Sequence, residues 1–312
     1  MRKFSTNAKC CKIFSRTANF RKRVLTDGKG AIVAAGMDDL VSTADREVYR
    51  RDGAVCLRGL FAEAWVAALA AGVAHNRAEP GPMATHYTDP GRPGGYFGDY
   101  CNWRRVTQFR DFVFGSPAAA VAAALMDSRT VQFFHEHVLV KDAGTEEETP
   151  WHHDQPYYVV DGRQVVSLWV PLDPVPRAVC PRFVAGSHRW GKLFYPRRFK
   201  DGVDYDYAGD GFERLPDIDA GDHTLLAWDL APGDAIAFHF LTVHDAPANR
   251  LAQPRRVISF RWLGDDARYA ERPGVPSPPY PEMGIDLKTG ERMRTDWFPV
   301  VWPVEARTEE AP

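Results

Sequence analysis

The stretch VQFFHEHVLVK, residues 131–141, marks a change in the character of the sequence. From this point on, short runs rich in Val, Ile, Phe and Trp are separated by turns that contain Gly, Pro and Asp. Several short strands at close spacing, with no long helices between them, are typical of a β-sandwich or barrel and exclude a Rossmann or TIM fold. The sequence therefore predicts a mainly β jelly roll, with further strands at 164–173, 182–188, 223–230, 234–245 and 255–263.

Flanking helices are expected before this β region. The segment 43–53 reads as a short polar helix closed by its final glycine, and a strand follows at Ala54–Leu57. Apolar residues at helical spacing and a high Ala content predict two further helices, at 62–78 and 116–128. In the last of these we expect Ser116 as the N-cap, with proline at the first helical position.

The pattern predicts one domain over residues 37–312, with the jelly-roll core at about 130–263. Hydrophobic residues make up 45% of the chain, which is enough to fill a sizeable core. We expect residues 80–115, which are rich in Gly, Pro and aromatic residues, to form loops that cover the core. The Pro-rich residues 264–312 are expected to form an irregular strap on the barrel.

Charge is distributed unevenly along the chain. Residues 1–36 contain nine Lys or Arg and the single acid Asp27, a net charge of +8. Because the whole chain carries −2, residues 37–312 carry −10, and an acidic body does not suggest a nucleic-acid partner. The basic segment has almost no acid, a composition compatible with a transit peptide, a disordered tail, or sequence upstream of a true start at Met37.

Cysteine usage bears on the compartment. Five cysteines without a CxxC pair leave an odd number, which argues against a disulfide framework and indicates a reducing environment. We therefore expect a cytoplasmic protein, or an organellar one if residues 1–36 are a transit peptide. Charged residues interrupt every apolar run before it reaches the roughly 20 residues of a membrane span, so no span is expected.

The segment WHHDQPYY, residues 151–158, contains the first candidate for chemistry. In an extended backbone, side chains two residues apart share a face, so His152 and Asp154 can converge while His153 points elsewhere. An imidazole and a carboxylate form only part of a metal site. A third ligand is expected from a late strand, since a jelly roll brings distant strands together.

The segment 234–245 offers two histidines for that position. His239 and His244 differ by five residues and should face opposite sides of a strand, and His244 lies at the strand end beside turn residues. His152, Asp154 and His244 then form a set of two histidines and one carboxylate, which leaves positions open and is typical of non-haem Fe(II) oxygenases. A structural zinc site would close its fourth position, usually with Cys.

The strand predicted at 255–263 adds a candidate anion anchor. Residues 255, 257, 259 and 261 share one face, so Arg255 and Ser259 can point inward together. An arginine fork beside a hydroxyl matches a carboxylate bidentately, which suits the end of a dicarboxylate cosubstrate that is not bound to metal.

These motifs together resemble the phytanoyl-CoA dioxygenase family of Fe(II)/2-oxoglutarate oxygenases. The resemblance runs from Tyr49 to about Trp262 and rests on the ordered segments YRRDGAVCLRGLF, PWHHDQPYY, SLWVPLDPV, GSHRWG, GDAIAFHFLTVHDAPAN and RRVIS. It implies a double-stranded β-helix, a cupin-like jelly roll, in which the three candidate ligands hold iron and Arg255 binds the distal carboxylate of 2-oxoglutarate. It also implies that Trp169, and less directly His137, line the cosubstrate pocket.

One segment departs from the family pattern. Relatives usually carry an Asn-Gly hairpin turn before the Gly-Ser-His, whereas RAVCPRFVAGSH, residues 177–188, has none. Pro181 cannot donate a hydrogen bond to a sheet, so strand pairing around 178–182 is in doubt. Several aromatic residues are candidates both for the substrate pocket and for the core: Trp151, Tyr157, Tyr158, Tyr96 and Phe97.

The sequence therefore predicts an Fe(II)- and 2-oxoglutarate-dependent dioxygenase that uses O2 to hydroxylate a small organic substrate, supported in vitro by ascorbate. Two alternatives remain. A metal-dependent hydrolase or isomerase could use Zn or Mn on the same barrel, although it would not need Arg255 or Trp169. A catalytically silent small-molecule binding barrel would not need the intact set of three ligands.

Overall fold

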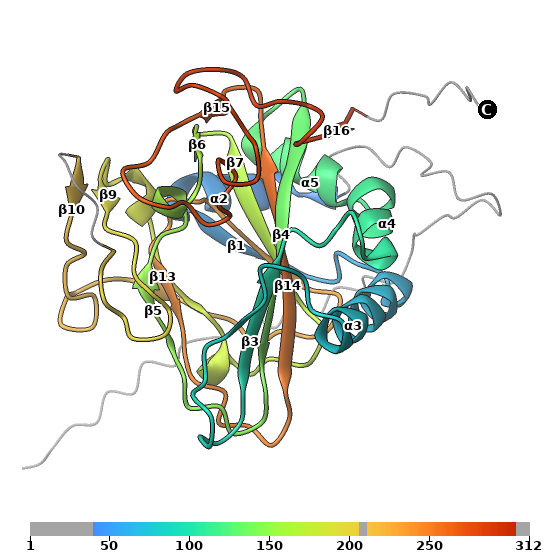
Figure 1. Ribbon diagram of the computed structural model, residues 1–312, viewed down its shortest axis with the longest axis vertical. Coiled ribbons are helices and arrows are strands. Elements are labelled where there is room, and N and C mark those ends of the chain that lie inside the picture. Colours follow the sequence, from blue (N-terminus) through green and yellow to red (C-terminus); the bar gives the residue numbers. More distant parts are fainter. Residues whose placement is uncertain (1–39, 206–210, 304–312) are drawn as a thin grey trace, which may run out of the picture. The chain divides into compact units, whose positions relative to one another are not determined.

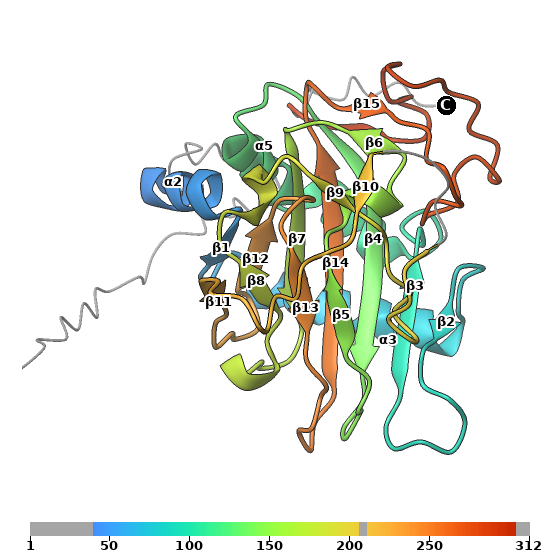
Figure 2. The same ribbon diagram turned by 90° about the vertical axis from the view of Figure 1, so that its left-hand side faces the viewer.

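The computed structural model describes residues 40–205 and 211–303. Two antiparallel sheets face each other and form a double-stranded β-helix, the jelly roll that the sequence predicts (Figures 1 and 2). The expected extension at 1–36 lies outside the described residues, as does the end of the expected strap at 304–312. The division of the chain into an extension and a single domain therefore stays a prediction.

The larger sheet has eight strands in the order β1-β12-β7-β14-β4-β3-β2, with β16 pairing the end of β4. All of its pairings are antiparallel. Its strands are β1 (Ala54–Leu57), β2 (Thr85–His86), β3 (Tyr96–Tyr100), β4 (Val131–Lys141), β7 (Val165–Pro171), β12 (Ala235–Phe238), β14 (Arg255–Leu263) and β16 (Val300–Trp302).

The smaller sheet has four antiparallel strands in the order β11-β8-β13-β5. They are β11 (Leu225–Leu226), β8 (Arg182–Val184), β13 (His244–Ala246) and β5 (Thr149–His152). Two short strand pairs lie outside both sheets: β9 (Leu193–Phe194) with β10 (Phe212–Glu213), and β6 (Val160–Asp161) with β15 (Arg268–Tyr269).

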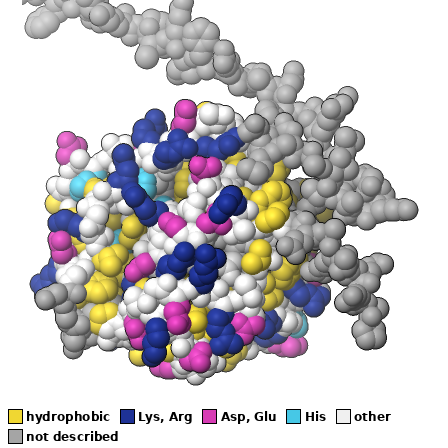
Figure 3. All heavy atoms as spheres, turned by 90° about the horizontal axis from the view of Figure 1, so that it is seen from above, with side chains coloured by type: hydrophobic (Ala, Val, Ile, Leu, Met, Phe, Trp, Pro, Cys, Tyr) yellow, Lys and Arg dark blue, Asp and Glu magenta, His cyan; other side chains and the backbone are white. Residues whose placement is uncertain are grey.

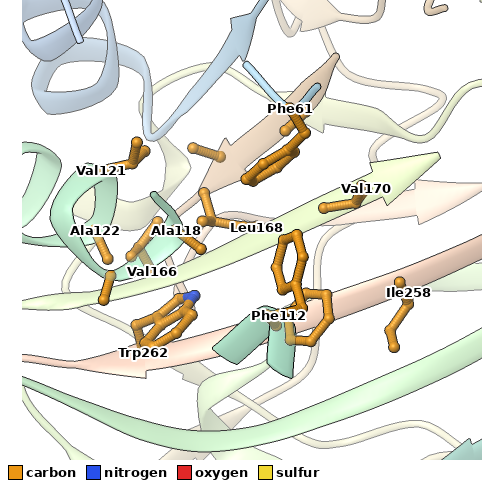
Figure 4. Close-up of a cluster of buried hydrophobic side chains, with 14 of the residues drawn as sticks. Phe61, Phe112, Ala118, Val121, Ala122, Val166, Leu168, Val170, Ile258 and Trp262 are labelled. Carbon is orange, nitrogen blue, oxygen red and sulfur yellow. The ribbon is translucent and has the colours of Figure 1, made fainter. Parts of the chain in front are cut away.

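Because side chains alternate along the long strands, the two faces of the larger sheet have different surroundings. On β14, Ile258, Phe260 and Trp262 pack with apolar residues of the helices, and this cluster surrounds Phe61 and Phe112 (Figure 4). The intervening residues, from Arg255 to Arg261 in steps of two, face the space between the sheets. The outer face of the larger sheet therefore carries the main hydrophobic core, whereas its inner face carries polar side chains together with a smaller apolar cluster that includes Trp169, Phe238 and Val257.

Four helices are described: α2 (Thr43–Asp52), α3 (Glu63–Ala78), α4 (Thr107–Gly115) and α5 (Ala118–Met126). Helix α2 begins with a capping box at Ser42 and ends at Gly53, whose φ of 79° is left-handed. The N-cap of α5 is Pro117, and Ser116 makes only a 3.3 Å contact from its Oγ to the Ala118 N–H. The predicted cap at Ser116 was therefore one residue too early.

The expectation of loops over residues 80–115 was wrong for much of that range. Strand β3 is an integral, buried strand of the larger sheet, paired with β4, and helix α4 packs Phe109, Phe112 and Val113 into the core. Glycine and proline at 80–95 hid the change to regular structure that follows them. By contrast, the described residues 265–303 are mostly irregular, apart from β15 and β16.

In the described part of the chain, no single helix is long and apolar enough to cross a membrane; α4 and α5 pass such a test only as a pair bent by 50°. All nine residues of α5 are buried in this fold. On the face shown in Figure 3, Lys and Arg side chains are interspersed with Asp and Glu.

Candidate iron and 2-oxoglutarate site

Three side chains that the sequence singled out meet between the two sheets. His152, Asp154 and His244 are all buried, and one potential ligand atom from each lies within 4.8 Å of the others. The Asp154 Oδ1 atom is 3.7 Å from His152 Nε2 and 4.0 Å from His244 Nε2. The three residues thus form a compact set of two imidazoles and one carboxylate.

The local backbone brings these residues together differently from the prediction. His152 ends β5, but Asp154 is helical (φ −73°, ψ −38°) and precedes the short 3-10 helix Gln155–Tyr157. The Phe240 carbonyl accepts hydrogen bonds from the Asp154 and Gln155 N–H groups at 2.8 and 3.0 Å. This turn, and not strand alternation, aims the carboxylate at the histidines.

The sequence suggested that His239 and His244 lie on one strand, and this was wrong. Strand β12 ends at Phe238 in the larger sheet, and β13 begins at His244 in the smaller sheet. His239 lies outside the three-residue set. Its Nδ1 accepts a hydrogen bond from the Leu241 N–H, and its Nε2 donates one to the Arg163 carbonyl.

Both histidines of the set have a fixed ring orientation. A carbonyl only accepts hydrogen bonds, so each Nδ1 donates: His152 to the Pro150 carbonyl at 2.8 Å, and His244 to the Thr242 carbonyl at 2.9 Å. Each Nε2 is then unprotonated in the neutral ring and carries its lone pair toward Asp154, which is the tautomer that a metal ligand requires.

Electrostatics favour the ligand-competent protonation states. Burial opposes ionisation of Asp154, but the Arg261 guanidinium and the two imidazoles outweigh it and lower the pKa of this carboxyl below its usual range. Burial, helped by His152, lowers the pKa of His244 to about 3. Asp154 therefore presents a carboxylate, and His244 a neutral imidazole, near neutral pH.

His153 points away, as the sequence predicts. Its Nε2 accepts a hydrogen bond from the buried Phe194 N–H at 2.9 Å, and burial lowers the pKa of its imidazole to about 3. His153 therefore holds strand β9 in place and does not face the other two histidines.

A cavity of about 310 Å³ extends from the three-residue set between the sheets. Arg255, Ser259 and Trp169 line this cavity and come from neighbouring strands of the larger sheet. Aromatic side chains also line it: Tyr87, Tyr100, Tyr157, Tyr158, Phe199 and Tyr205. Tyr96 also lines the cavity, whereas Trp151 and Phe97 pack in hydrophobic clusters instead.

Arg255 is 4% exposed, and burial lowers the pKa of its guanidinium to about 10. Its Nη1 donates to the Val179 carbonyl, and among the described residues no carboxylate lies within ion-pair distance. Its neighbour Arg256 points to the opposite face of β14 and pairs with Asp173 at 2.6 Å. A buried guanidinium without a carboxylate partner is well suited to bind an anion.

Two further polar atoms in the cavity lack partners. Neither the buried Ser259 Oγ nor the His137 Nε2 has a hydrogen-bond partner in the described structure. Ser259 is the register neighbour of both His137 on β4 and Trp169 on β7. The four predicted cosubstrate residues therefore come from three adjacent strands and line one wall.

The atypical turn at 177–188 contributes to this wall. Residues Arg177–Val179 form a 3-10 turn, and β8 begins only at Arg182, so strand pairing is absent at Pro181. The turn aims the Val179 carbonyl at Arg255, and Pro181 lines the cavity. The departure from the usual hairpin thus leaves the ligand residues undisturbed.

The contacts of several cavity residues were not predicted from the sequence. Arg261 was placed on the inner face of β14 by alternation, but nothing local indicated that it would reach Asp154. His135 lines the cavity with a buried Nδ1 that lacks a partner in the described structure, and Phe199 packs its ring 4.8 Å from that of His152. These contacts join segments far apart in sequence, so spacing alone could not reveal them.

The model of the phytanoyl-CoA dioxygenase family matches residues 49–257. The chain belongs to this family. A curated relative from Caenorhabditis elegans, described as a probable phytanoyl-CoA dioxygenase, is 27% identical over 172 residues. That match covers 51% of this chain and 53% of the relative, so the chain spans about half of that family member.

Solved structures share the fold of the present chain. The non-haem epimerase SnoN from nogalamycin biosynthesis, in complex with Fe3+, alpha ketoglutarate and nogalamycin RO, aligns with a TM-score of 0.66 and 24% identity, covering 83% of this chain and 97% of that one. The carbocyclase SnoK gives 0.66 and 21% over 84% and 96%. EctD from S. alaskensis, with 2-oxoglutarate and 5-hydroxyectoine, gives 0.60 and 20% over 76% and 80%.

Proposed function

We propose that this protein is an Fe(II)- and 2-oxoglutarate-dependent oxygenase that hydroxylates a small organic substrate. The observation that carries the proposal is the pairing of two features in one cavity. One is the buried set of His152, Asp154 and His244, and the other is the buried Arg255 without a carboxylate partner. Family membership supports the same reaction class.

The donor set fits Fe(II). Two imidazole nitrogens and one carboxylate oxygen, all from one side, leave coordination positions open for further ligands. A closed structural zinc site does not fit, because no cysteine belongs to the set. The Nδ1 hydrogen bonds of His152 and His244 to backbone carbonyls are the kind of outer contact that fixes metal-binding histidines.

The cavity also fits 2-oxoglutarate. Arg255 offers a guanidinium fork for the C5 carboxylate, and the unpartnered Ser259 hydroxyl can donate to the same group. Trp169 forms the apolar wall beside the carbon chain, and His137 borders the same space. A cosubstrate held at both ends would satisfy polar atoms that otherwise stay buried without partners.

When bound, iron and 2-oxoglutarate supply oxidation of an unactivated C–H bond by O2, with succinate and CO2 as co-products. The chain's own residues bind and orient the cosubstrate and the substrate, and they exclude water from the cavity. Phe199, Tyr157 and Tyr87 enclose the space beyond His152 and hold an apolar part of the substrate near the reacting position.

The test is production of succinate from 2-oxoglutarate by the purified protein with Fe(II) and ascorbate, in the presence of candidate substrates. We expect succinate only when both iron and 2-oxoglutarate are present, together with a product heavier by one oxygen atom. Metal-dependent hydrolysis or isomerisation would proceed without 2-oxoglutarate, and a silent binding barrel would form no succinate. Either result would overturn the proposal.

A further inference from the structure

Arg261 occupies an unusual position beside Asp154. Its side chain is 5% exposed and its guanidinium divides its donors among three partners. Nε donates to the Tyr158 hydroxyl at 2.6 Å, Nη1 to the Ser259 carbonyl at 3.0 Å, and Nη2 lies 3.7 Å from Asp154 Oδ2. Two hydrogen bonds and one ion-pair contact from one planar group leave it little freedom to rotate.

The two oxygens of the Asp154 carboxylate therefore have different surroundings. Oδ1 faces the Nε2 atoms of His152 and His244. Oδ2 faces the Arg261 guanidinium and accepts a 3.4 Å hydrogen bond from the Ser167 hydroxyl. Arg261 and Ser167 thus contact Oδ2 on the side away from the histidines, while Oδ1 is directed at the candidate metal position.

We infer that Arg261 is a positioning residue that makes Asp154 a one-oxygen metal ligand. The inference rests on the proposed function, which supplies the metal. A carboxylate free to rotate can offer both oxygens to a cation and occupy a second coordination position. By holding Oδ2, Arg261 and Ser167 keep that position open for the cosubstrate, while Arg261 compensates the charge of a buried carboxylate.

Orientation and charge make opposite predictions for loss of this arginine. If only the positive charge mattered, Arg261→Gln would bind a divalent cation more tightly, because a repulsive charge near the site is removed. If orientation dominates, binding weakens, because the released carboxylate no longer keeps Oδ1 facing the Nε2 atoms of His152 and His244, and any form that offers both oxygens changes the coordination number. Outer contacts of metal ligands typically contribute about 10–100-fold to metal affinity, and we expect a loss of that order.

The experiment measures Co(II) binding by the metal-free protein through calorimetry and the visible absorption bands of bound Co(II), which report coordination number. The variants are Arg261→Gln, Arg261→Lys and Tyr158→Phe, with Arg256→Gln as the matched control on the opposite face of β14. We expect Arg261→Gln and Arg261→Lys both to bind about 10–100-fold more weakly and to change the Co(II) spectrum. Lysine fails as well because a point charge cannot keep three partners at once.

Tyr158→Phe removes the hydroxyl that anchors Arg261 and that also interacts with the Asp154 carboxylate, and it should give a smaller loss with the same spectral change. It also keeps the inference testable if Arg261→Gln does not fold. Unchanged or tighter Co(II) binding in the folded Arg261 variants, or an unchanged affinity and spectrum in Tyr158→Phe, would overturn the inference alone. A wild-type protein that binds no Co(II) would overturn the proposed function as well.

Discussion

His244 on β13 is the register partner of His152 on β5, and their ring centroids lie 4.2 Å apart. Ninety-two residues of sequence separate them, yet strand pairing in the smaller sheet fixes their relative position. Asp154, two residues beyond His152, completes the set from the following turn. The smaller sheet and the turn that follows β5 therefore carry all three candidate metal ligands.

Removal of any one ligand should abolish metal-dependent turnover. We expect His152→Ala, Asp154→Ala and His244→Ala each to lose Fe(II) binding while the protein remains folded, because the site closes no structural loop by itself. Asp154→Ala should also lose stability, because it leaves the buried Arg261 without its carboxylate partner. Circular dichroism and metal titration of the purified variants check both parts.

The adjacent His153 should behave differently. His153→Ala leaves the buried Phe194 N–H without an acceptor, so we expect a loss of about 1–3 kcal/mol in the free energy of unfolding with Fe(II) binding retained. Denaturant titration and metal binding separate the two effects. Weaker iron binding in His153→Ala than in His152→Ala would show that the ligand assignment is wrong.

Arg255→Ala should weaken 2-oxoglutarate binding. A charged hydrogen-bonded contact contributes about 1.5–3 kcal/mol, which corresponds to roughly 10–150-fold in affinity. Anaerobic titration of the Fe(II)-loaded protein, followed by the metal-to-ligand charge-transfer band, measures this affinity. Arg255→Lys should recover only part of it, because lysine lacks the guanidinium fork.

Arg256→Ala is the matched control for that titration. Arg256 forms its ion pair with Asp173 on the outer side of β14, so its loss should leave the 2-oxoglutarate affinity unchanged. Equal affinities in the wild type and Arg255→Ala would remove the main support for a 2-oxoglutarate enzyme.

The sequence predicted the strands that carry the site more accurately than the turns that aim it. Strand β4 at residues 131–141 and strand β14 at 255–263 follow from β-branched and aromatic runs, and alternation on β14 correctly placed Arg255 and Ser259 inside. The helical turn at Asp154 could not be predicted, because it depends on the Phe240 carbonyl from a segment far along the chain.

The same limit explains the error at residues 80–115. Strand β3 contains Gly98, where an added Cβ would lie 2.8 Å from the Tyr87 ring and would force that ring to shift, so close packing favours a residue that usually weakens a strand. Arg261 was missed as a partner of Asp154 for a related reason. Alternation gives the direction of a side chain, but only the closed barrel determines which carboxylate lies opposite.

Acid pH should destabilise the metal-free protein through its buried histidines. Burial, with His188 nearby, lowers the pKa of His239 to about 4, below its ordinary value of 6.5. Between these values the unfolded chain binds more protons than the folded one. The stabilising contribution is therefore complete above about pH 6.5 and is lost as the pH falls toward 4.

His239→Asn should make that pH dependence shallower. One titrating histidine contributes at most about 1.4 kcal/mol per pH unit to the slope. Denaturant titrations from pH 4 to 7, in the presence of a chelator, give the slope for each protein. Identical slopes would mean that His239 does not change its protonation on unfolding.

Deletion of residues 1–36 should leave the melting temperature and the activity nearly unchanged. The segment contains no periodic apolar face that could dock on the domain, and the family match begins only at residue 49. Thermal unfolding of the full chain and of the shortened one provides the comparison. A clear drop in melting temperature would show that the segment belongs to the fold.

The division of the site between two sheets has a consequence for the choice of cosubstrate. The metal ligands belong to the smaller sheet and its turn, whereas Arg255 and Ser259 belong to β14 of the larger sheet. Facing sheets pack at a nearly constant separation of about 10 Å. On the proposed function, a 2-oxo diacid must bridge this gap. The separation of the sheets therefore selects the cosubstrate by the length of its carbon chain. Oxaloacetate, one methylene shorter, would leave one of its two ends unbound.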